Sequence, residues 1–265
     1  PTAVIFHGLA GSYESPYIQG MMTALSHSGY NTVLMHFRGC SGKVNILPRS
    51  YHSGETGDAL EFINSLHKRF PDVNLYGVGF SLGGNMLLKL LGEVKENSPL
   101  HAAAIISPPM QLDVCANAIN QGISQIYERR LVKDLNKALI KKYAVNDMES
   151  YIGLEIKEVK KLKTFWEFDS AYTAPIHGFQ SAQDYYTKSS SKQFLKDIHT
   201  PTLIIHSYDD PFMNTEIIPT QKEVSKNVSL ELSKYGGHVG FVEGSFFKPK
   251  YWLEERVVHF LNENK

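Results

Sequence analysis

One serine lies at the centre of the most informative motif in this sequence. Ser81 occurs in the peptide GFSLG, residues 79–83, so that glycines stand two positions before it and two after it. An apolar, strand-like run precedes the serine and a helical apolar pattern follows it, which is the context expected of a nucleophile elbow. Small flanking residues let strand and helix approach each other while the serine adopts strained backbone angles. The motif predicts a nucleophilic serine, and a plain glycine-rich loop is the less favoured interpretation.

A serine hydroxyl at neutral pH needs a general base, and the base needs an acid that fixes its tautomer. Among 11 histidines, His238 is the predicted base, because it follows the last strand-like run on the glycine-rich loop YGGHVGF. Asp209 and Asp210 both follow the penultimate strand-like run, and either is a candidate acid. We favour Asp210, which comes third after the small residue Ser207 and directly before a proline. This position of the acid is common in hydrolases that use a serine, a histidine and an aspartate together. The chain order serine, aspartate, histidine is the one found in α/β-hydrolases.

Acyl transfer also needs hydrogen-bond donors for the oxyanion, and backbone N–H groups that are already fixed in place serve best. One predicted donor is the N–H of Leu82, directly after the serine. The second is assigned to Leu9, in the loop FHGLAGS after the first strand-like run, where glycines let the backbone turn inward. No group of His, Cys, Asp or Glu shows the spacing of metal ligands, so the sequence predicts neither a metal nor a cofactor.

Composition narrows the class of partner. Lys plus Arg and Asp plus Glu are both 27, so no overall charge attracts nucleic acid, and the expected partner is a small molecule. Only two cysteines, Cys40 and Cys115, are present, which fits a reducing compartment and favours a cytoplasmic location. No apolar run reaches the roughly 18 residues of a membrane-spanning helix, so we expect a soluble protein.

Short apolar runs rich in β-branched residues alternate with segments of helical period. The strand-like runs are residues 2–6, 31–37, 73–80, 101–107, 201–207 and 227–232. Runs of this kind are typical of parallel strands buried on both faces, and in residues 58–70 apolar side chains recur at helical spacing. The pattern predicts a mostly parallel sheet flanked by helices. Because the chain begins at Pro1, directly on a strand-like run, we expect N-terminal strands to be missing from it.

The alternation breaks between about 110 and 195, where the sequence becomes helical and then loop-rich. So many residues between two strand-like runs predict a helical cap inserted over the sheet, within a single α/β-hydrolase domain of residues 1–265. One predicted cap helix has Leu131, Leu135, Leu139 and Tyr143 on one face and Lys133, Lys137 and Lys141 on another. A solvated lysine face is the favoured interpretation, and peripheral membrane contact through it is the alternative.

Seven motifs together resemble the YheT-type family of α/β-hydrolases. They are HGLAGS, HFRGCSG, GFSLGGN, TAPIHGF, DYYTKSS, TLIIHSYDDPF and GGHVGF, and they extend through nearly the whole chain, cap included. The resemblance implies Ser81 as nucleophile, Asp210 as acid and His238 as base. Activities in that family include carboxylesterase, lipase, phospholipase and alcohol acyltransferase chemistry, so it implies an acyl-ester substrate. Relatives also carry an N-terminal segment that is expected to supply the first one or two strands.

The sequence thus predicts a serine hydrolase that cleaves acyl esters with medium- to long-chain acyl groups, or lipid esters, through an acyl-enzyme. An alcohol acyltransferase with the same triad and a non-catalytic binding module are the alternatives. Three further side chains receive structural interpretations in preference to functional ones. We expect Arg38 to tie neighbouring loops together, Cys40 to be a packed thiol, and His177 to brace the cap against the core.

Overall fold

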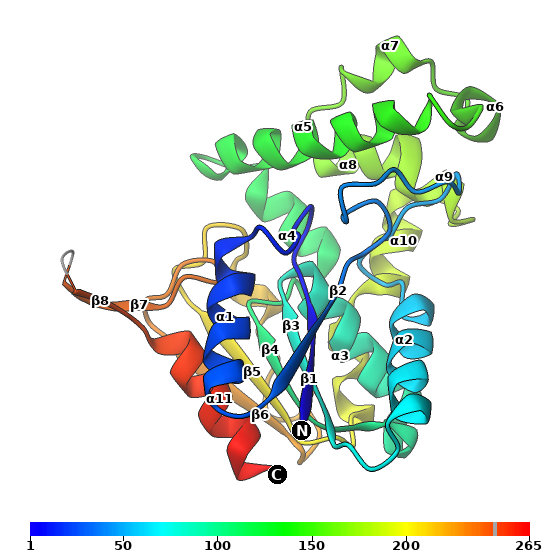
Figure 1. Ribbon diagram of the computed structural model, residues 1–265. Helices are drawn as coiled ribbons and strands as arrows, with labels where there is room; N and C mark the ends of the chain where they lie inside the picture. Colours follow the sequence, from blue (N-terminus) through cyan, green and yellow to red (C-terminus); the bar gives the residue numbers. More distant parts are fainter. Residues whose placement is uncertain (246–247) are drawn as a thin grey trace.

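The structure, a computed structural model, describes residues 1–245 and 248–265. A parallel sheet of six strands has the order β2-β1-β3-β4-β5-β6 (Figure 1). Its strands are β1 (Thr2–Phe6), β2 (Asn31–Met35), β3 (Leu75–Phe80), β4 (Leu100–Ile106), β5 (Thr202–Ser207) and β6 (Val228–Ser233). The predicted sheet and its six strands are therefore confirmed. A separate antiparallel ribbon of β7 (Val242–Ser245) and β8 (Lys248–Tyr251) was not anticipated from the sequence.

Helices cover both faces of the sheet. The helices α1 (Pro16–His27) and α11 (Trp252–Glu263) pack on one face, and α2 (Gly57–Arg69) and α3 (Leu82–Val94) pack on the other (Figure 1). Successive residues of β1 enter different cores, because side chains alternate along a strand: Ala3 and Ile5 belong to the first, and Val4 and Phe6 to the second. All of these side chains are buried, which explains why the strand reads as a continuous apolar run.

The segment for which the sequence predicts a cap is helical and lies between β4 and β5. Its elements are α4 (Leu112–Ile119), α5 (Ser124–Lys142), α6 (Met148–Ile152), α7 (Ile156–Val159), α8 (Phe165–Phe168), the π-helix η2 (Asp169–Thr173), α9 (Ala174–Ile176), α10 (Ala182–Ser189) and η3 (Ser191–Asp197). Figure 1 shows α4 to α9 beyond the carboxyl edge of the sheet. The helices around α5 have an apolar cluster of their own, which includes Val132, Leu139 and Phe168.

Within the described ranges, no helix has both the length and the apolar character needed to cross a bilayer.

Candidate active site

Ser81 lies on the sharp turn between β3 and α3, with φ 49° and ψ −118°. A positive φ of this kind is unfavourable for a residue with a side chain, so the turn is strained. The two flanking glycines, Gly79 and Gly83, are required because other backbone atoms lie too close to leave room for a side chain. A Cβ at Gly79 would lie 2.8 Å from the Cα of Gly84, and one at Gly83 would lie 2.5 Å from the carbonyl oxygen of His7. The sequence therefore folds into an elbow here because only glycine leaves room for it.

His238 connects Ser81 to Asp210. Its Nε2 is 3.0 Å from Ser81 Oγ, and its Nδ1 is 2.8 Å from Asp210 Oδ2. In the tautomer that fits both contacts, Nδ1–H donates to the carboxylate and Nε2 accepts the serine hydroxyl. The Asp210 side chain is completely buried, while the His238 side chain keeps 11% of its surface exposed. The loops after three different strands thus deliver the three predicted side chains to one place.

The two neighbouring aspartates have different partners. Asp210 uses its second oxygen to accept the N–H of Phe212 at 2.9 Å, which fixes the orientation of the carboxylate. Asp209 instead accepts the N–H groups of Gly236 and Gly237 at 2.9 and 2.8 Å. Asp209 therefore holds the loop that carries the histidine, and Asp210 contacts the histidine itself.

Two tyrosine hydroxyls fix the loop that carries Leu9. The Gly8 N–H donates to the hydroxyl of Tyr17 at 2.9 Å, and the Ala10 N–H donates to the hydroxyl of Tyr51 at 2.8 Å. Between them, the N–H of Leu9 has no acceptor among the described residues. The loop is thus held on both sides of one available donor.

Leu82 supplies a second available donor beside the serine. It is the first residue of α3, and the first N–H groups of a helix have no intrahelical acceptor. The partial positive charge at this end of the helix also favours a negative oxygen there. The Leu9 loop lies close to this position, because a Cβ built on Gly8 would be 3.3 Å from the Cβ of Ser81.

His7 fixes the base of the Leu9 loop and is completely buried. Its Nδ1 lies 2.7 Å from the carbonyl oxygen of Gly8, and its Nε2 lies 3.1 Å from the backbone nitrogen of Phe37. These contacts fit a neutral ring that donates at Nδ1 and accepts at Nε2. Burial lowers the pKa of His7 to about 4, which keeps the ring neutral. His7 therefore ties the loop to the end of β2.

A cavity of about 830 Å³ opens above Ser81 and extends beneath the cap. Apolar and aromatic side chains from the cap form much of its lining, among them Leu112, Cys115, Ile119, Leu131, Leu135, Phe165, Phe168, Tyr172 and Tyr185. Phe212 also lines it and packs against the ring of His238, with 4.3 Å between the ring centroids. A pocket of this size and character suits a small molecule with an apolar body.

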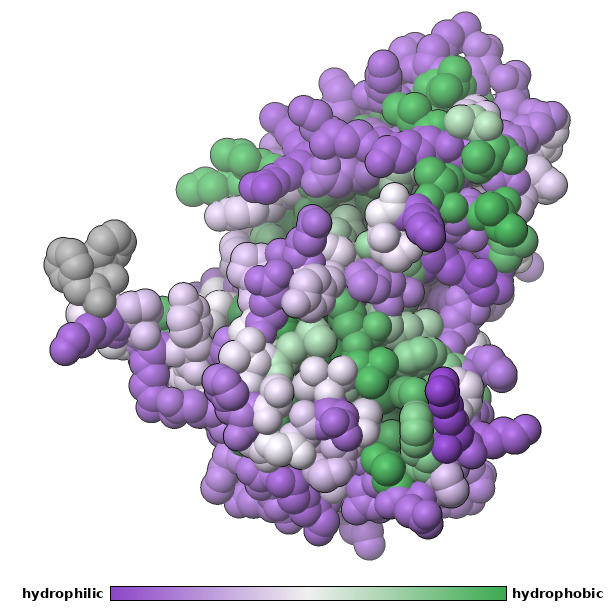
Figure 2. Space-filling model, in the orientation of Figure 1, coloured by the Kyte–Doolittle hydropathy of each residue, from purple (hydrophilic) through white to green (hydrophobic). Residues whose placement is uncertain are grey.

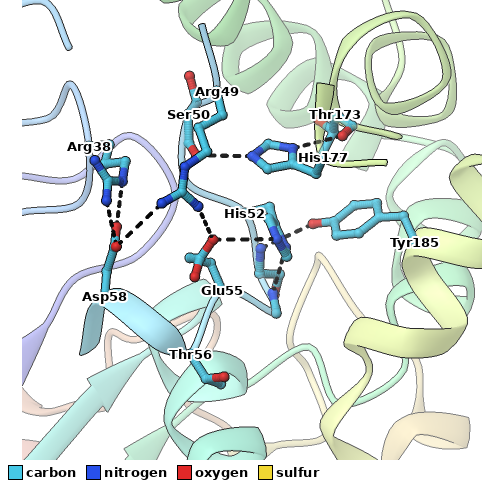
Figure 3. A network of polar contacts seen from close by, with 12 residues as sticks. Arg38, Arg49, Ser50, His52, Glu55, Thr56, Asp58, Thr173, His177 and Tyr185 are labelled. Carbon is cyan, nitrogen blue, oxygen red and sulfur yellow. Dashed lines mark hydrogen bonds and ion pairs between the residues drawn. The ribbon is translucent and has the colours of Figure 1, made fainter. Parts of the chain in front are cut away.

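Arg38 and Cys40 both line the cavity, and their contacts agree with the structural roles predicted from the sequence. Arg38 forms a bidentate pair with Asp58 of α2, with both N–O distances 2.5 Å, so its guanidinium is engaged (Figure 3). Burial raises the pKa of the Cys40 thiol to about 11, which keeps it protonated at neutral pH. Within the part of the chain that the structure describes, no group of three or more His, Cys, Asp or Glu side chains could hold a metal ion.

Sequence reasoning missed Tyr17, Tyr51 and Asn85. Asn85 is buried in α3 and donates to the carbonyl oxygens of Ser53 and Ser189 at 3.0 and 2.8 Å, so it ties the elbow helix to two other segments. A polar residue four positions after the serine, inside an otherwise apolar helical pattern, was the available signal for Asn85. The tyrosines had none, since their role depends on a contact across the fold.

A parallel sheet whose third strand ends in a strained serine, beside histidine and aspartate from later loops, is the arrangement of the α/β-hydrolases. The family model for the α/β hydrolase fold matches residues 1–245, and the chain belongs to this family. It is 41% identical over 264 residues to YheT of Escherichia coli (strain K12), which is named provisionally as an esterase, covering 98% of this chain and 76% of YheT. The predicted resemblance to YheT-type proteins is thereby confirmed.

Two further comparisons agree with this assignment. Human phospholipase ABHD3 is 30% identical over 271 residues, and the match covers 98% of this chain but 63% of that protein. The chain thus spans less than two thirds of the length of that relative. Among solved structures, the Pyrococcus furiosus esterase Pf2001 superimposes with a TM-score of 0.61 over 99% of this chain and 82% of its own. At 19% identity, that likeness concerns the fold alone.

Proposed function

We propose that this protein is a serine hydrolase that cleaves carboxylic acyl esters, with Ser81 as nucleophile, His238 as base and Asp210 as acid. The observation that carries the proposal is the hydrogen-bonded series of these three side chains, with distances of 3.0 and 2.8 Å, at one end of a largely apolar cavity. The esterase and phospholipase names of its relatives support the same class of reaction.

In the acylation step, His238 Nε2 accepts the Ser81 proton as Oγ attacks the ester carbonyl carbon. The carbonyl oxygen becomes negative and accepts hydrogen bonds from the N–H groups of Leu9 and Leu82, which need no rearrangement to donate them. His238 then gives its proton to the departing alcohol, and the acyl group remains on Ser81. Asp210 stays ionised and stabilises the imidazolium.

In the second step, His238 removes a proton from water, and the resulting attack releases the acid and restores the Ser81 hydroxyl. An alcohol in place of water would give a new ester, so an alcohol acyltransferase is the alternative within the same chemistry. The ratio of acid to ester formed in the presence of added alcohol separates the two. Ligand binding without an acyl-enzyme would instead indicate a non-catalytic binding module.

The cavity favours a medium- to long-chain acyl group or a lipid ester as the substrate. Its lining by side chains such as Leu131, Leu135 and Phe168 offers an apolar surface for the chain. Each methylene that leaves water for such a surface contributes about 0.8 kcal/mol. The rate should therefore rise with acyl length until the chain fills the cavity.

Peripheral contact of the cap with an anionic lipid surface would suit such a substrate. Ile123, Ile126 and Tyr127 are 79%, 67% and 45% exposed at the start of α5, where Figure 2 shows an apolar projection. Lys133, Lys137 and Lys141 are exposed further along the same helix. We expect vesicles that contain anionic lipid to retain the protein in sedimentation, and Ile126→Asp to reduce this retention. The free thiols of Cys40 and Cys115 fit a cytoplasmic location.

A fluorophosphonate probe tests the proposed function, because it labels a serine only where the serine is activated. We expect wild type and Ser65→Ala to be labelled, since Ser65 is an exposed serine of α2 that does not line the cavity, and Ser81→Ala to be unlabelled. Hydrolysis of p-nitrophenyl esters from acetate to palmitate should show an optimum of acyl length. Absence of labelling in folded wild-type protein would contradict the proposal.

A further inference from the structure

One wall of the cavity has no regular secondary structure. Residues 38–45, between β2 and α2, line the cavity, and the chain continues through residues 46–50 toward α2. We call residues 45–50 the strap. Among the described hydrogen bonds, none joins two backbone groups within residues 41–50. Exposed apolar side chains also show that burial does not hold this segment, because Ile46 is 79% and Val44 is 40% exposed.

The side chain of Lys142, at the end of α5, holds the strap by contacting the backbone carbonyls of the strap. Its Nζ lies 2.7 Å from the carbonyl oxygen of Leu47, 3.2 Å from that of Arg49 and 3.5 Å from that of Asn45. An ammonium group has three N–H donors, so each carbonyl is matched by one. Lys142 is only 4% exposed, and no carboxylate of the described residues lies within 4.0 Å of it.

A buried ammonium without a carboxylate is unfavourable unless other groups replace its hydration. Burial, with a contribution from the nearby Arg38, lowers the pKa of Lys142 to about 8, so the charged form still prevails at neutral pH. The strap carbonyls are the groups that replace water around it. Removal of the ammonium would leave the carbonyls of Leu47 and Asn45 without a donor, while that of Arg49 would keep the Asn45 amide as its donor at 2.7 Å. Buried acceptors without partners favour exposure to water.

Two more cap residues, Tyr172 and His177, contact strap carbonyls that Lys142 does not reach. The Tyr172 hydroxyl donates to the carbonyl oxygen of Pro48 at 2.9 Å. His177 lies between cap and strap, with Nδ1 2.8 Å from the carbonyl oxygen of Thr173 and Nε2 3.0 Å from that of Ser50 (Figure 3). The predicted role of His177 as a brace between cap and core is thus confirmed. Of the strap carbonyls, only that of Ile46 receives no such contact among the described residues.

We propose that Lys142 is a positioning residue for the substrate cavity: it fastens the strap to the cap, so that the cavity wall of residues 38–45 and the cap move as one body. This inference rests on the proposed function, because the wall matters only if substrate occupies the cavity. Lys142 itself lines the cavity, but its Nζ contacts the strap carbonyls, so it acts through the backbone of the strap and does not touch the reacting atoms. Its loss should weaken binding of substrates that reach the wall and leave the chemical step intact.

The test compares Lys142→Met with Lys160→Met, which removes an equal charge from an exposed site in the cap outside the cavity. Limited trypsin digestion should cleave after Lys43 about tenfold faster in Lys142→Met, as expected for the loss of one charge-assisted hydrogen bond, and at the wild-type rate in Lys160→Met. The KM for long-chain p-nitrophenyl esters should rise about as much in Lys142→Met, with kcat for the acetate ester within about twofold of wild type.

Equal cleavage and equal KM in the two variants would overturn the proposal, and so would faster cleavage with an unchanged KM. If Lys142→Met does not fold, Tyr172→Phe serves instead, because it removes only the hydroxyl that contacts the strap at the Pro48 carbonyl and at Ser50 Oγ. This variant should accelerate cleavage after Lys43 about threefold. The wild-type cleavage rate in that variant would then overturn the proposal. Trypsin cleavage does not depend on activity, so a failure of the esterase assignment would appear separately, as unlabelled wild-type protein.

Discussion

Asp210 accepts two hydrogen bonds at once, from His238 Nδ1–H at 2.8 Å through Oδ2 and from the Phe212 N–H at 2.9 Å through Oδ1. The second contact leaves the carboxylate one orientation in which it meets the imidazole. The neighbouring Asp209 is committed to other backbone donors. The two aspartates should therefore respond very differently to the same substitution.

Asp210→Asn should lower kcat by roughly a thousandfold or more, because an amide in this position favours the wrong tautomer of the histidine. Asp209→Asn keeps an oxygen that can accept from Gly236 and Gly237, so we expect a loss of less than about tenfold. Steady-state hydrolysis of p-nitrophenyl butyrate measures both. A larger loss in Asp209→Asn than in Asp210→Asn would show that the acid has been misassigned.

Tyr51→Phe should reduce kcat about tenfold, because the Ala10 N–H loses its acceptor and the Leu9 donor is less well fixed. Tyr17→Phe should act in the same way through Gly8. The control is Tyr235→Phe, at an exposed tyrosine outside the cavity. An unchanged kcat in both Tyr51→Phe and Tyr17→Phe would mean that these hydroxyls do not order the Leu9 loop.

Gly83→Ala should destabilise the fold by about 2 kcal/mol or more, because its Cβ would lie 2.5 Å and 2.6 Å from the carbonyl oxygens of His7 and Phe6. Backbone atoms on both sides of this contact cannot turn away as a side chain could. Gly57→Ala is the matched control, since the added Cβ would meet only a carboxylate oxygen of Glu55 at 3.1 Å. The midpoint temperature of thermal unfolding and the extent of fluorophosphonate labelling should both be lower in Gly83→Ala. In Gly57→Ala both should remain near the wild-type values.

Asp169 should make the stability of the protein depend on pH. Burial raises the pKa of this cavity-lining carboxyl from its usual 3.8 to about 6, so the folded state holds the proton at pH values where the unfolded chain has lost it. Its contribution to stability is complete below about pH 4 and is lost as the pH rises through about 6.

Asp169→Asn removes this dependence and keeps an acceptor for the Tyr186 hydroxyl, which lies 2.7 Å from the carboxylate. At about 1.4 kcal/mol per pKa unit, the variant should be more stable than wild type at pH 8 by up to about 3 kcal/mol. The difference should shrink as the pH falls to 5. Asp72→Asn, at an exposed position, should show no such trend in denaturant titrations at the two pH values. A constant difference for Asp169→Asn would contradict the linkage.

Sequence reasoning was most informative where a local pattern decides the structure. The six strands and α2 follow from apolar periodicity, and the elbow at Ser81 follows from glycine spacing that only a tight turn requires. The predicted strand of residues 31–37 was too long, because β2 ends at Met35. The physical reason lies in another element: the Phe37 N–H donates to His7 and not to a neighbouring strand.

Features that depend on contacts across the chain were out of reach. Tyr51 and Ala10 are 41 residues apart, and Lys142 reaches carbonyls that precede it by 93 to 97 residues. Neither contact leaves a periodic trace in the sequence. The sequence predicts a solvated face for Lys133, Lys137 and Lys141, but gives no sign that the adjacent Lys142 is buried.

The contacts between the cap and the strap separate two requirements on one segment. The first is to hold the cavity wall in place, and the second is to present side chains to the substrate. Lys142, Tyr172 and His177 contact main-chain carbonyls, and every residue type has a carbonyl. The side chain of Val44, which borders the cavity and is 40% exposed, takes no part in these contacts. Substrate preference can therefore be redesigned at Val44 while the attachment of the strap stays intact, which makes this part of the wall a suitable place to diversify the enzyme.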